Sequence, residues 1–532
     1  MSAAPMTVGR YVIETLAANG IDTAFGIPGV HNIELYRGLE SRRVRHVLAR
    51  HEQNAAFAAD GFARASGRPA AAFVISGPGL TNALTAIAQA ASDSVPMLII
   101  ASTPVRASLG RHWGVLHELA DQRAVAAGAA GLALHAGSAQ ELRENLAAAF
   151  AYLSGGRPRP AYVGVPLDLL AEKTALEPER FARAAPAPPP DASAIEAARA
   201  LLERAERPLI VAGGGARHAG AALAQLAEAL DGYLVTTAAG KGVVPEGHPA
   251  NLGASLPYRA TQELLATADV VLAVGTELAE TDVYTTIRLK FPGRVIRIDI
   301  DAAQLTDRSA QEVAIHADAR AALEQLAAAL RPRRGWRARA GDARGKRLAI
   351  EAQIGAHWRP ALTAVRALRA AVPPEGVVFS DMTQIAYTGN YAFAADRPGS
   401  WFHPAGYGTL GFALPAAIGA KVAEPQTPVV ALAGDFGVQF TLQELMTAVE
   451  LQLPLPVVVW NNQALAQIRD DMVAAGIEPI GVAGRNPDFI ALAAACGAQG
   501  LRVQGPDGLV QGVRTALAAR GPTLIEARDT DF

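Results

Sequence analysis

Three polar residues near the C-terminal end of the chain follow two apolar segments that are expected to be strands. Asp435 follows residues 429–433, and Asn461 and Asn462 follow residues 455–460. In a parallel sheet the carboxyl ends of strands share one edge, where open α/β sheets bind ligands. A carboxylate, an amide oxygen and a backbone carbonyl suit Mg²⁺ or Ca²⁺, with a diphosphate completing the shell. The spacing therefore predicts a metal and diphosphate site.

A second group of candidate residues lies in the first hundred residues. Glu52 begins an almost wholly apolar helical segment, where partial desolvation would raise the pKa of its carboxyl and allow proton exchange near neutrality. The structural alternative is a glutamate that the helix dipole favours at an N-terminus. Some 25 residues later, the turn Gly77-Pro78-Gly79 follows another expected strand, and Asp93 follows further on. Glycines there let the backbone approach a ligand closely.

Together, Glu52, the Gly-Pro-Gly turn and the Asp435/Asn462 pair resemble the signature of the thiamine diphosphate-dependent 2-oxo acid decarboxylases and acetohydroxyacid synthases. The motifs occur in the order of that superfamily, over nearly the whole chain. The resemblance implies an N-terminal domain that binds the cofactor pyrimidine, a central structural or regulatory domain, and a C-terminal domain that binds the diphosphate. It implies thiamine diphosphate and Mg²⁺ as cofactors. It also implies a homo-oligomer, at least a dimer and often a tetramer, because the cofactor lies between two chains.

The resemblance assigns roles to individual residues. Glu52 would hydrogen-bond the pyrimidine ring nitrogen, and the carbonyl of Gly408 would accept the 4′-amino hydrogen. Leu410 matches the bulky apolar residue that holds the cofactor in its V shape. The other expected cofactor contacts are Gly77, Pro78, Asn82, Thr383, Gln384, Gly434, Asp435, Gly437 and Asn462.

The metal ligands implied by the resemblance are the side chains of Asp435 and Asn462 and the carbonyl of Ala464. One position nearby departs from the family pattern, because Gly-Asp-Gly is here Gly-Asp-Phe, with Phe436 in third place. Metal binding does not use the side chain of that glycine, so Asp435 keeps its expected role. The substitution bears on the geometry of the turn, since a side chain restricts φ.

Two histidines and a glutamine are candidate catalytic residues. His31 follows a glycine-rich turn at an expected strand end, where related decarboxylases and lyases place a proton-shuttling histidine. The alternative is a hydrogen-bonded loop histidine. Residues 116–122 occupy the place where family members present a glutamine to the reacting centre, and either Gln122 or His117 could fill that role. A site rich in histidine favours protonation of the reaction intermediate, and therefore decarboxylation.

Substrate selection is expected at Gln467 and Asp471. Asp471 is the ninth residue after Asn462, where acetohydroxyacid synthases carry a tryptophan that selects a small aliphatic acceptor. A carboxylate in an apolar pocket is costly unless it is paired, and a guanidinium would pair it through a bidentate contact. The alternatives are that Asp471 binds Arg469 or another arginine, or that it faces solvent.

The runs 25–31, 35–39 and 50–53 resemble the bacterial 5-guanidino-2-oxopentanoate decarboxylases. We therefore expect non-oxidative decarboxylation of a 2-oxo acid, 5-guanidino-2-oxopentanoate, to an aldehyde and CO₂. The alternative is a carboligase or lyase of the acetolactate synthase or benzaldehyde lyase type. FAD is possible but not favoured, because Gly213-Gly214-Gly215 after one strand is weak evidence for a second cofactor.

The elements that must position these residues alternate short Val/Ile/Leu-rich runs with Ala-rich helical patterns. This alternation predicts three doubly wound parallel α/β sheets, in domains 1–184, 191–330 and 348–532. The proline-rich residues 185–190 and the arginine-rich residues 331–347 are expected to be connectors. Strands are expected at 71–76, 97–102, 209–212, 270–274, 295–300, 377–380, 429–433 and 455–460.

Bulk composition narrows the class of protein. The 532 residues carry a net charge of −2 with 18% charged and 50% hydrophobic residues, typical of a large globular enzyme. Neither nucleic acid nor a membrane is expected as a partner, and the arginines of 331–347 lack supporting aromatic and basic neighbours. The single cysteine, Cys496, and the absence of a signal-peptide pattern or an apolar run of about 20 residues indicate a cytoplasmic protein.

Overall fold

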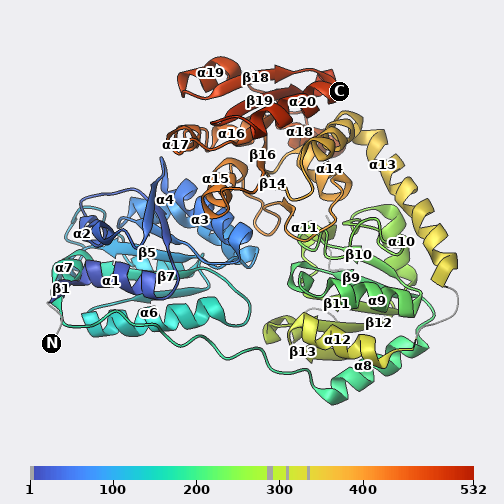
Figure 1. The fold of residues 1–532 in the computed structure, drawn as a ribbon, viewed down its shortest axis with the longest axis horizontal. Coiled ribbons are helices and arrows are strands. Elements are labelled where there is room, and N and C mark those ends of the chain that lie inside the picture. The colour runs from blue at the N-terminus through green and yellow to red at the C-terminus, as the bar shows by residue number, and fades with distance from the viewer. Residues whose placement is uncertain (1–4, 284–290, 307–310, 332–335) are drawn as a thin grey trace.

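The computed structural model describes residues 5–283, 291–306, 311–331 and 336–532 and contains three parallel sheets flanked by helices (Figure 1). The N-terminal sheet has the order β3-β2-β4-β5-β7-β6. Its strands are β2 (Thr23–Gly26), β3 (Arg45–Leu48), β4 (Ala71–Val74), β5 (Leu98–Thr103), β6 (Leu132–His135) and β7 (Ala161–Pro166). Its helices are α1 (Val8–Ala18), α2 (Ile33–Gly38), α3 (Glu52–Ser66), α4 (Pro78–Ser92), α5 (Gln122–Ala127), α6 (Ala139–Ser154) and α7 (Leu167–Ala171). A two-stranded antiparallel pair, β1 (Met6–Thr7) and β8 (Lys173–Thr174), joins the two ends of this domain.

The central sheet has the order β10-β9-β11-β12-β13. Its strands are β9 (Pro208–Ala212), β10 (Tyr233–Thr236), β11 (Val270–Val274), β12 (Arg294–Asp299) and β13 (Val313–His316). The helices around it are α8 (Ala192–Arg204), α9 (Gly220–Leu230), α10 (Arg259–Thr267), α11 (Glu280–Val283) and α12 (Ala319–Ala329). Residues 175–191, which join this domain to the first, form neither helix nor strand, as the proline-rich composition of 185–190 predicts.

The C-terminal sheet has the order β15-β14-β16-β17-β19-β18. Its strands are β14 (Val377–Ser380), β15 (Trp401–Phe402), β16 (Val429–Gly434), β17 (Pro456–Asn461), β18 (Gln499–Val503) and β19 (Thr523–Arg528). Its helices are α13 (Trp336–Ala371), α14 (Gln384–Ala392), α15 (Ala413–Ala423), α16 (Asp435–Gln439), α17 (Glu444–Glu450), α18 (Ala466–Ala474), α19 (Phe489–Ala495) and α20 (Gly505–Leu517).

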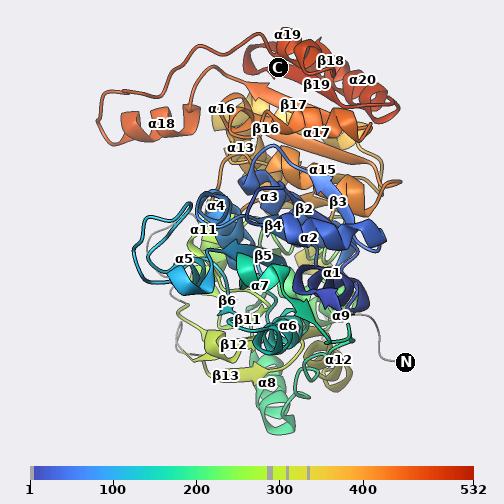
Figure 2. The same ribbon diagram turned by 90° about the vertical axis from the view of Figure 1, so that its left-hand side faces the viewer.

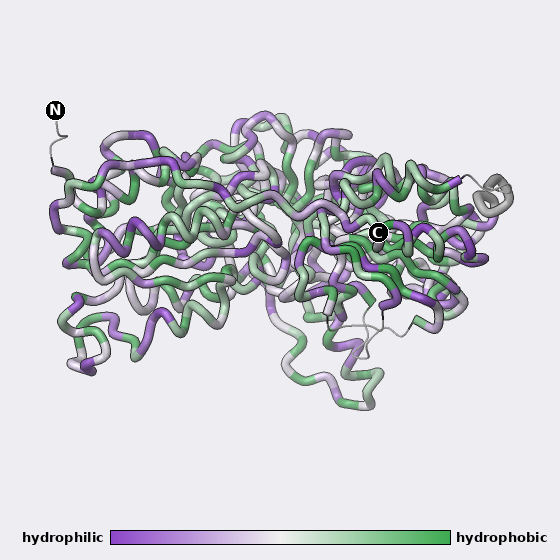
Figure 3. The backbone as a smooth tube through the Cα atoms, turned by 90° about the horizontal axis from the view of Figure 1, so that it is seen from below, coloured by the Kyte–Doolittle hydropathy of each residue, from purple (hydrophilic) through white to green (hydrophobic). Residues whose placement is uncertain are grey.

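All strand pairs in the three sheets are parallel. In each sheet the strand order reverses near one end, between β2 and β4, between β9 and β11, and between β14 and β16, and the N- and C-terminal sheets reverse again at β6–β7 and β18–β19. The predicted fold class is therefore confirmed, and each expected strand ends within two residues of an observed one. The exact domain boundaries stay a prediction. In the part of the chain that is described, no helix has the length and apolarity of a membrane span. Hydrophobic and hydrophilic runs alternate along the backbone (Figure 3).

The expectation of a connector over 331–347 is wrong for residues 336–347, which form the start of α13. Figure 1 shows this helix alongside the central domain. Ala343 is fully buried in the core of that domain, and Arg347 Nη1 donates to the carbonyl of Asn251 at 2.6 Å. The apolar stripe is too sparse to reveal the helix, although arginine, alanine and lysine are good helix formers. The backbone of Trp358 leaves helical geometry just before Pro360, so α13 kinks there.

The N-terminal and C-terminal domains share one hydrophobic core through α3 and α15. A Cβ atom on Gly61 of α3 would lie 1.9 Å from the carbonyl oxygen of Ala416, and one on Gly419 would lie 1.8 Å from that of Ala58. Only glycine allows this close approach of the two helices. In the same core the ring of Phe57 on α3 lies 5.5 Å, between centroids, from that of Phe412, the residue before α15.

His403, which follows β15, makes the stability of the folded chain depend on pH. Its side chain is 8% exposed, and Nδ1 lies 2.9 Å from Ser380 Oγ. Burial, with a smaller contribution from the Arg64 charge, lowers the pKa of His403 to about 3. The unfolded chain takes up a proton below its ordinary pKa of about 6.5 and the folded chain does not, so stability is lost as pH falls. From pH 7.5 to 5.5 the loss is about 1.4 kcal/mol.

We therefore expect His403→Gln to show a smaller fall in Tm than the wild type between pH 7.5 and 5.5. Differential scanning calorimetry of both proteins at the two pH values measures this difference. The other buried histidines are present in both proteins, so their contributions to the fall in Tm cancel in the comparison. Equal falls in Tm would mean that His403 is already protonated in the folded chain.

Candidate functional site

The predicted metal and diphosphate residues follow three neighbouring strands of the C-terminal sheet. β14, β16 and β17 are adjacent and parallel, with Ser380 beside Leu432 and Gly434 beside Trp460. The loops that carry Thr383, Asp435 and Asn462 consequently leave the same carboxyl edge, at the point where the strand order reverses. This arrangement confirms the expected common edge and matches the place where doubly wound sheets bind ligands.

Asp435 is a buried carboxylate without a cationic partner in the described residues. The residue is 3% exposed, and Oδ1 accepts a hydrogen bond from the backbone N–H of Phe436 at 3.0 Å. Its Oδ2 accepts from Asn486 Nδ2 at 2.7 Å. Burial raises the pKa of Asp435, and the hydrogen bond from Asn486 partly offsets this rise. A desolvated carboxylate that meets only neutral donors fits a site that is completed by a cation.

The two asparagines at the end of β17 belong to different hydrogen-bond networks. Asn461 is buried, donates from Nδ2 to Glu526 Oε1 at 2.7 Å and accepts from Asn486 Nδ2 at 3.0 Å. Asn462 Oδ1 accepts from the backbone N–H of Ala464 at 3.2 Å. Asp435, Asn462 and the carbonyl of Ala464 would therefore supply one charged and two neutral oxygen donors, which fits Mg²⁺ with a diphosphate completing its shell. Among the described residues, no group of three or more His, Cys, Asp or Glu side chains is placed so that it could hold a metal ion.

Close packing explains two of the expected glycines. A Cβ atom on Gly434 would lie 2.9 Å from Thr383 Oγ1, and one on Gly437 would lie 3.3 Å from Asp381 Oδ2. Thr383 and Gly434 are the residues immediately before α14 and α16, so the N-terminal ends of both helices open at this edge. Free backbone N–H groups at helix N-termini favour anions such as a diphosphate.

Phe436, in place of the usual glycine, is accommodated by helical backbone. Residue 436 lies in the first turn of α16, where φ is negative and a side chain is tolerated. The ring packs on Gly484, whose Cβ atom would lie 2.9 Å from Phe436 Cζ. A cavity of about 380 Å³ beside this ring is also lined by Asn486 and Phe440. The turn that carries Asp435 is thus supported by the segment around 484–486.

Gly408 and Leu410 lie in the 403–411 loop between β15 and α15. Gly408 has φ +73°, the left-handed region that glycine favours, and Leu410 is half-buried. Asp381 Oδ2 accepts the backbone N–H of Gly411 at 2.9 Å and fixes the end of this loop.

Glu52 is the first residue of α3, as predicted. Its side chain is half-buried, and Oε2 accepts from Asn82 Nδ2 at 2.9 Å. Asn82 lies on the first turns of α4, which begins after the positive-φ Gly77. The two helices that follow β3 and β4 therefore bring the expected acid–base residue and the Gly-Pro-Gly turn together.

His31 and His117 meet at the carboxyl edge of the N-terminal sheet. Their ring centroids are 4.9 Å apart, and His31 Nδ1 lies 2.5 Å from Ser76 Oγ. Burial lowers the pKa of His31, and the neighbouring His117 lowers it further. His117 has φ +64°, and its Nδ1 atom is buried without a hydrogen-bond partner in the described structure. His31 follows β2 and Ser76 follows β4, the two strands between which the strand order reverses, and His117 lies in the loop after β5.

The side-chain amide of Gln122 is held by three hydrogen bonds. Its Nε2 donates to the carbonyl of Ser102 and to Tyr162 OH, both at 2.9 Å, and its Oε1 accepts the N–H of Gly77 at 2.9 Å. The residue is buried. Its amide therefore binds the Gly77 turn. Of the two alternatives at 116–122 for the residue that faces the reacting centre, the geometry favours His117.

Gln467 and Asp471 lie on α18, which Figure 2 shows standing away from the rest of the C-terminal domain. Gln467 Nε2 donates to Asp471 Oδ1 at 3.0 Å, and Asp471 is exposed. Arg469 pairs with Asp470 instead, whose Oδ2 also accepts from Gln384 Nε2 at 3.1 Å. The alternative in which Arg469 neutralises Asp471 is therefore wrong, and in the single chain Asp471 faces solvent.

The residues brought together thus form two groups, one around Glu52 and His31 and the other around Asp435 and Asn462. Within the described part of one chain, no hydrogen bond joins these groups. Asn486, which contacts both Asp435 and Asn461, is a residue that sequence reasoning missed. It lies 24 residues beyond Asn462 in a polar loop, and no pattern in the sequence marks it.

The Gly213–Gly215 turn of the central domain packs against its neighbouring loop. Gly213 and Gly215 donate their N–H groups to the carbonyls of Val274 and Gly275, at 2.9 and 3.1 Å. A Cβ atom on Gly213 would lie 2.3 Å from the Gly275 oxygen. Because these two amides are already bonded, they are not available to bind a phosphate.

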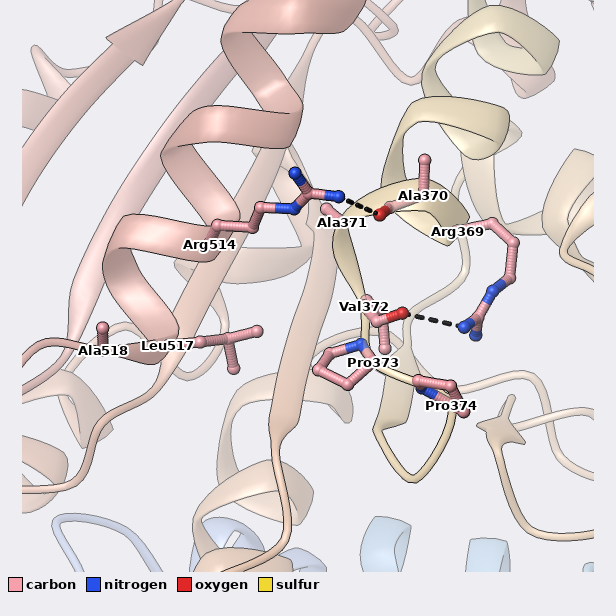
Figure 4. A pocket seen from close by; sticks show the side chains of 9 residues that line it. All are labelled: Arg369, Ala370, Ala371, Val372, Pro373, Pro374, Arg514, Leu517 and Ala518. Carbon is pink, nitrogen blue, oxygen red and sulfur yellow. Dashed lines mark hydrogen bonds between the residues drawn. The ribbon is translucent and has the colours of Figure 1, made fainter.

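A larger cavity, of about 560 Å³, lies between the end of α13 and α20 (Figure 4). Arg514 donates to the carbonyl of Ala370 at 2.9 Å and Arg369 donates to that of Val372 at 2.8 Å. Both arginines thus satisfy carbonyls at the C-terminal end of a helix. The lining residues lie in the segments that precede β14 and β19, so the cavity lies at the amino edge of the sheet, opposite the Asp435 edge.

Comparison with known proteins gives concordant matches along the chain. Three family models match: thiamine pyrophosphate enzyme, N-terminal TPP binding domain, over residues 6–125; central domain, over 195–326; and C-terminal TPP binding domain, over 381–527. A probable 2-ketoarginine decarboxylase of Pseudomonas aeruginosa is 48% identical over 529 residues, covering 98% of this chain and 94% of the relative. Acetolactate synthase isozyme 2 large subunit of Escherichia coli is 31% identical over 539 residues, covering 98% and 95%.

Proposed function

The chain belongs to the thiamine pyrophosphate enzyme family, and from that premise we propose that it decarboxylates a 2-oxo acid non-oxidatively, to an aldehyde and CO₂. The proposed substrate is 5-guanidino-2-oxopentanoate, which is the compound otherwise called 2-ketoarginine. The observation that carries this proposal is the likeness, over nearly the whole chain, to a relative named as a 2-ketoarginine decarboxylase.

Thiamine diphosphate, when bound, supplies the electron sink for the loss of CO₂. Glu52 would hold a proton between its carboxyl and the pyrimidine ring nitrogen, with Asn82 orienting the carboxylate through the 2.9 Å hydrogen bond. Asp435, Asn462 and the carbonyl of Ala464 would hold Mg²⁺. The proposed contacts to the rest of the cofactor are Gly77, Pro78, Thr383, Gln384, Gly408, Leu410, Gly434 and Gly437.

His31 and His117 are the proposed proton donors to the product carbon. Burial and the neighbouring His117 lower the pKa of His31, so its imidazolium form is a stronger proton donor than an ordinary histidine, and the contact of Nδ1 with Ser76 Oγ fixes the orientation of the ring. Proton delivery from this pair would complete an aldehyde. Gln122 would act indirectly, by holding the Gly77 turn. The second candidate is a carboligase, which the likeness to acetolactate synthases supports.

We propose that the active unit is a homo-oligomer of at least two chains, with a tetramer as the expected form. The Glu52 and Asp435 groups are not joined by hydrogen bonds within one described chain, so a second copy would bring them together. α18 and the residues after it expose large apolar side chains, which a second copy would cover. These side chains are Ile468, Val473, Ile477 and Ile480.

Asp471→Leu is expected to lower kcat/KM for 5-guanidino-2-oxopentanoate by about thirtyfold or more, because an unpaired guanidinium in the site loses about 2 kcal/mol or more. The effect on pyruvate decarboxylation should stay within a few-fold, since pyruvate carries no cation. Steady-state assays of CO₂ release with both acids measure the ratio. Asp471→Glu, which keeps the charge, is the matched control. Equal losses with both acids would make Asp471 a structural residue.

Removal of cofactor and metal tests the proposed function directly. Dialysis against EDTA should abolish CO₂ release from the guanidino acid, and activity should return only when both Mg²⁺ and thiamine diphosphate are added. Return of activity with Mg²⁺ alone or with thiamine diphosphate alone would contradict a site that the two share. Full activity after exhaustive dialysis, verified by metal analysis and by assay of residual thiamine diphosphate, would overturn the proposed chemistry.

A further inference from the structure

The 403–411 loop of the C-terminal domain is attached to the N-terminal domain through one carboxylate. Asp93, the residue after α4, accepts the backbone N–H of Gly406 on Oδ1 at 2.7 Å. A Cβ atom on Gly406 would lie 2.5 Å from that oxygen, so only glycine permits the contact. The loop is therefore fixed at its start by one domain and, through Gly411 and Asp381, at its end by the other.

Asp93 is itself held in place by buried partners. Its Oδ2 accepts from Arg64 Nη2 at 2.8 Å and from Gln89 Nε2 at 2.7 Å. Arg64 is paired at the same time with Asp60, from Nε to Oδ1 at 2.5 Å. The side chains of Asp60, Arg64 and Asp93 are 0%, 9% and 10% exposed. Buried charge pairs of this kind lose much of their stabilisation when one partner is removed.

Two further contacts join the same group of residues to the loop. Gln89 Oε1 accepts from Thr409 Oγ1 at 3.3 Å, next to Gly408 and Leu410. The Arg64 guanidinium lies 5.1 Å from the ring centroid of Phe412, just after the loop. Hydrogen bonds and a cation–π contact therefore flank the residues proposed to touch the cofactor.

We propose that Asp93 is a positioning residue, which places Gly408 and Leu410 before the cofactor binds. This inference rests on the proposed function, because the roles of Gly408 and Leu410 are part of it. α3 and α4, which carry Arg64 and Asp93 at their C-terminal ends, carry Glu52 and the Gly77 turn at their N-terminal ends. One pair of helices thus positions both the proton-exchanging carboxylate and the loop that shapes the cofactor.

The test uses hydrogen–deuterium exchange of the full-length, cofactor-free protein, read in peptides that cover residues 403–411. Asp93→Ala should exchange at least about tenfold faster there than the wild type, because the charged acceptor of Gly406 is lost. Asp93→Asn, which keeps an oxygen acceptor but not the charge that pairs with Arg64, should lie between them. The dissociation constant of thiamine diphosphate, from tryptophan fluorescence, should rise by about tenfold in Asp93→Ala with little change in the KM of the 2-oxo acid.

Glu444→Gln is the matched control. Glu444 is another buried carboxylate that joins the two domains, accepting from the N–H of Arg50 at 2.6 Å and from Asn54 Nδ2 at 3.0 Å. It does not touch the 403–411 loop, so exchange in this loop should stay at the wild-type rate in the control variant. If Asp93→Ala fails to fold, as circular dichroism would show, Asp93→Asn decides the question.

Hydrogen–deuterium exchange of residues 403–411 at the wild-type rate in the Asp93 variants would overturn the proposal. So would an acceleration in the loop that Glu444→Gln reproduces, because Asp93 would then only join the domains. Failure of the wild type to bind thiamine diphosphate would instead overturn the proposed function, and the exchange comparison distinguishes the two failures.

Discussion

Glu52→Ala is expected to lower turnover by about a thousandfold or more, because positioned acid–base groups contribute about 10²–10⁴ in rate. The fold should survive. Glu52 is half-buried on the first turn of α3 and is tied to the protein by the one hydrogen bond from Asn82. Loss of a carboxylate at a helix N-terminus costs about 0.3–1 kcal/mol. Steady-state CO₂ release and thermal unfolding of both proteins measure these two effects.

Glu52→Gln is the stricter variant, since it keeps the size of the side chain and an oxygen that can accept from Asn82. A similar loss of turnover in this variant would assign the effect to proton exchange rather than to packing. Activity within tenfold of the wild type in both variants, with cofactor bound, would leave Glu52 as an ordinary helix N-terminal residue.

Asp435→Asn is expected to abolish the stabilisation that Mg²⁺ and thiamine diphosphate give together and to lower turnover by about a thousandfold or more. At about one hundred times its dissociation constant a ligand stabilises a protein by about 2.7 kcal/mol, a rise in Tm of about 5 °C or more for domains of this size. Without ligands the Tm of the variant should be unchanged or higher, because the substitution removes a buried carboxylate that lacks a cationic partner.

Differential scanning fluorimetry with and without both ligands measures these shifts, and Asp507→Asn, at an exposed carboxylate of the same domain, is the control. A ligand-induced rise in Tm in Asp435→Asn equal to that of the wild type would place the metal elsewhere.

Co-expression of Asp435→Asn with Glu52→Ala links the two predictions. Random pairing of chains should restore about a quarter of the wild-type activity if each site takes Glu52 from one chain and Asp435 from its partner.

Much of the Asp435 edge is predictable from sequence because its determinants are local. Residues 429–433 and 455–460 are apolar runs too short for helices, and parallel strands bring the polar residues after them to one edge. Glu52 at the start of a helix is predictable for the same reason. α13 was missed because its contact with the central domain uses few apolar residues, such as Ala343, among many arginines.

The remaining contacts depend on tertiary structure that sequence spacing does not encode. Asn486 reaches Asp435 through a polar loop, and Asp93 reaches Gly406 across more than 300 positions of the chain. The choice between His117 and Gln122 depends on a positive φ at His117, which turns the backbone toward Gly77. Histidine adopts positive φ more often than most residues, but a non-glycine residue does so rarely, so the sequence gives little warning of it.

The most direct test of the central claim is product analysis with the purified protein, Mg²⁺ and thiamine diphosphate, with 5-guanidino-2-oxopentanoate and pyruvate supplied in parallel. The account predicts rapid CO₂ release from the guanidino acid with an equal amount of 4-guanidinobutanal, and little product from pyruvate. Acetolactate from pyruvate, with the guanidino acid unchanged, would contradict it and identify the protein as a carboligase.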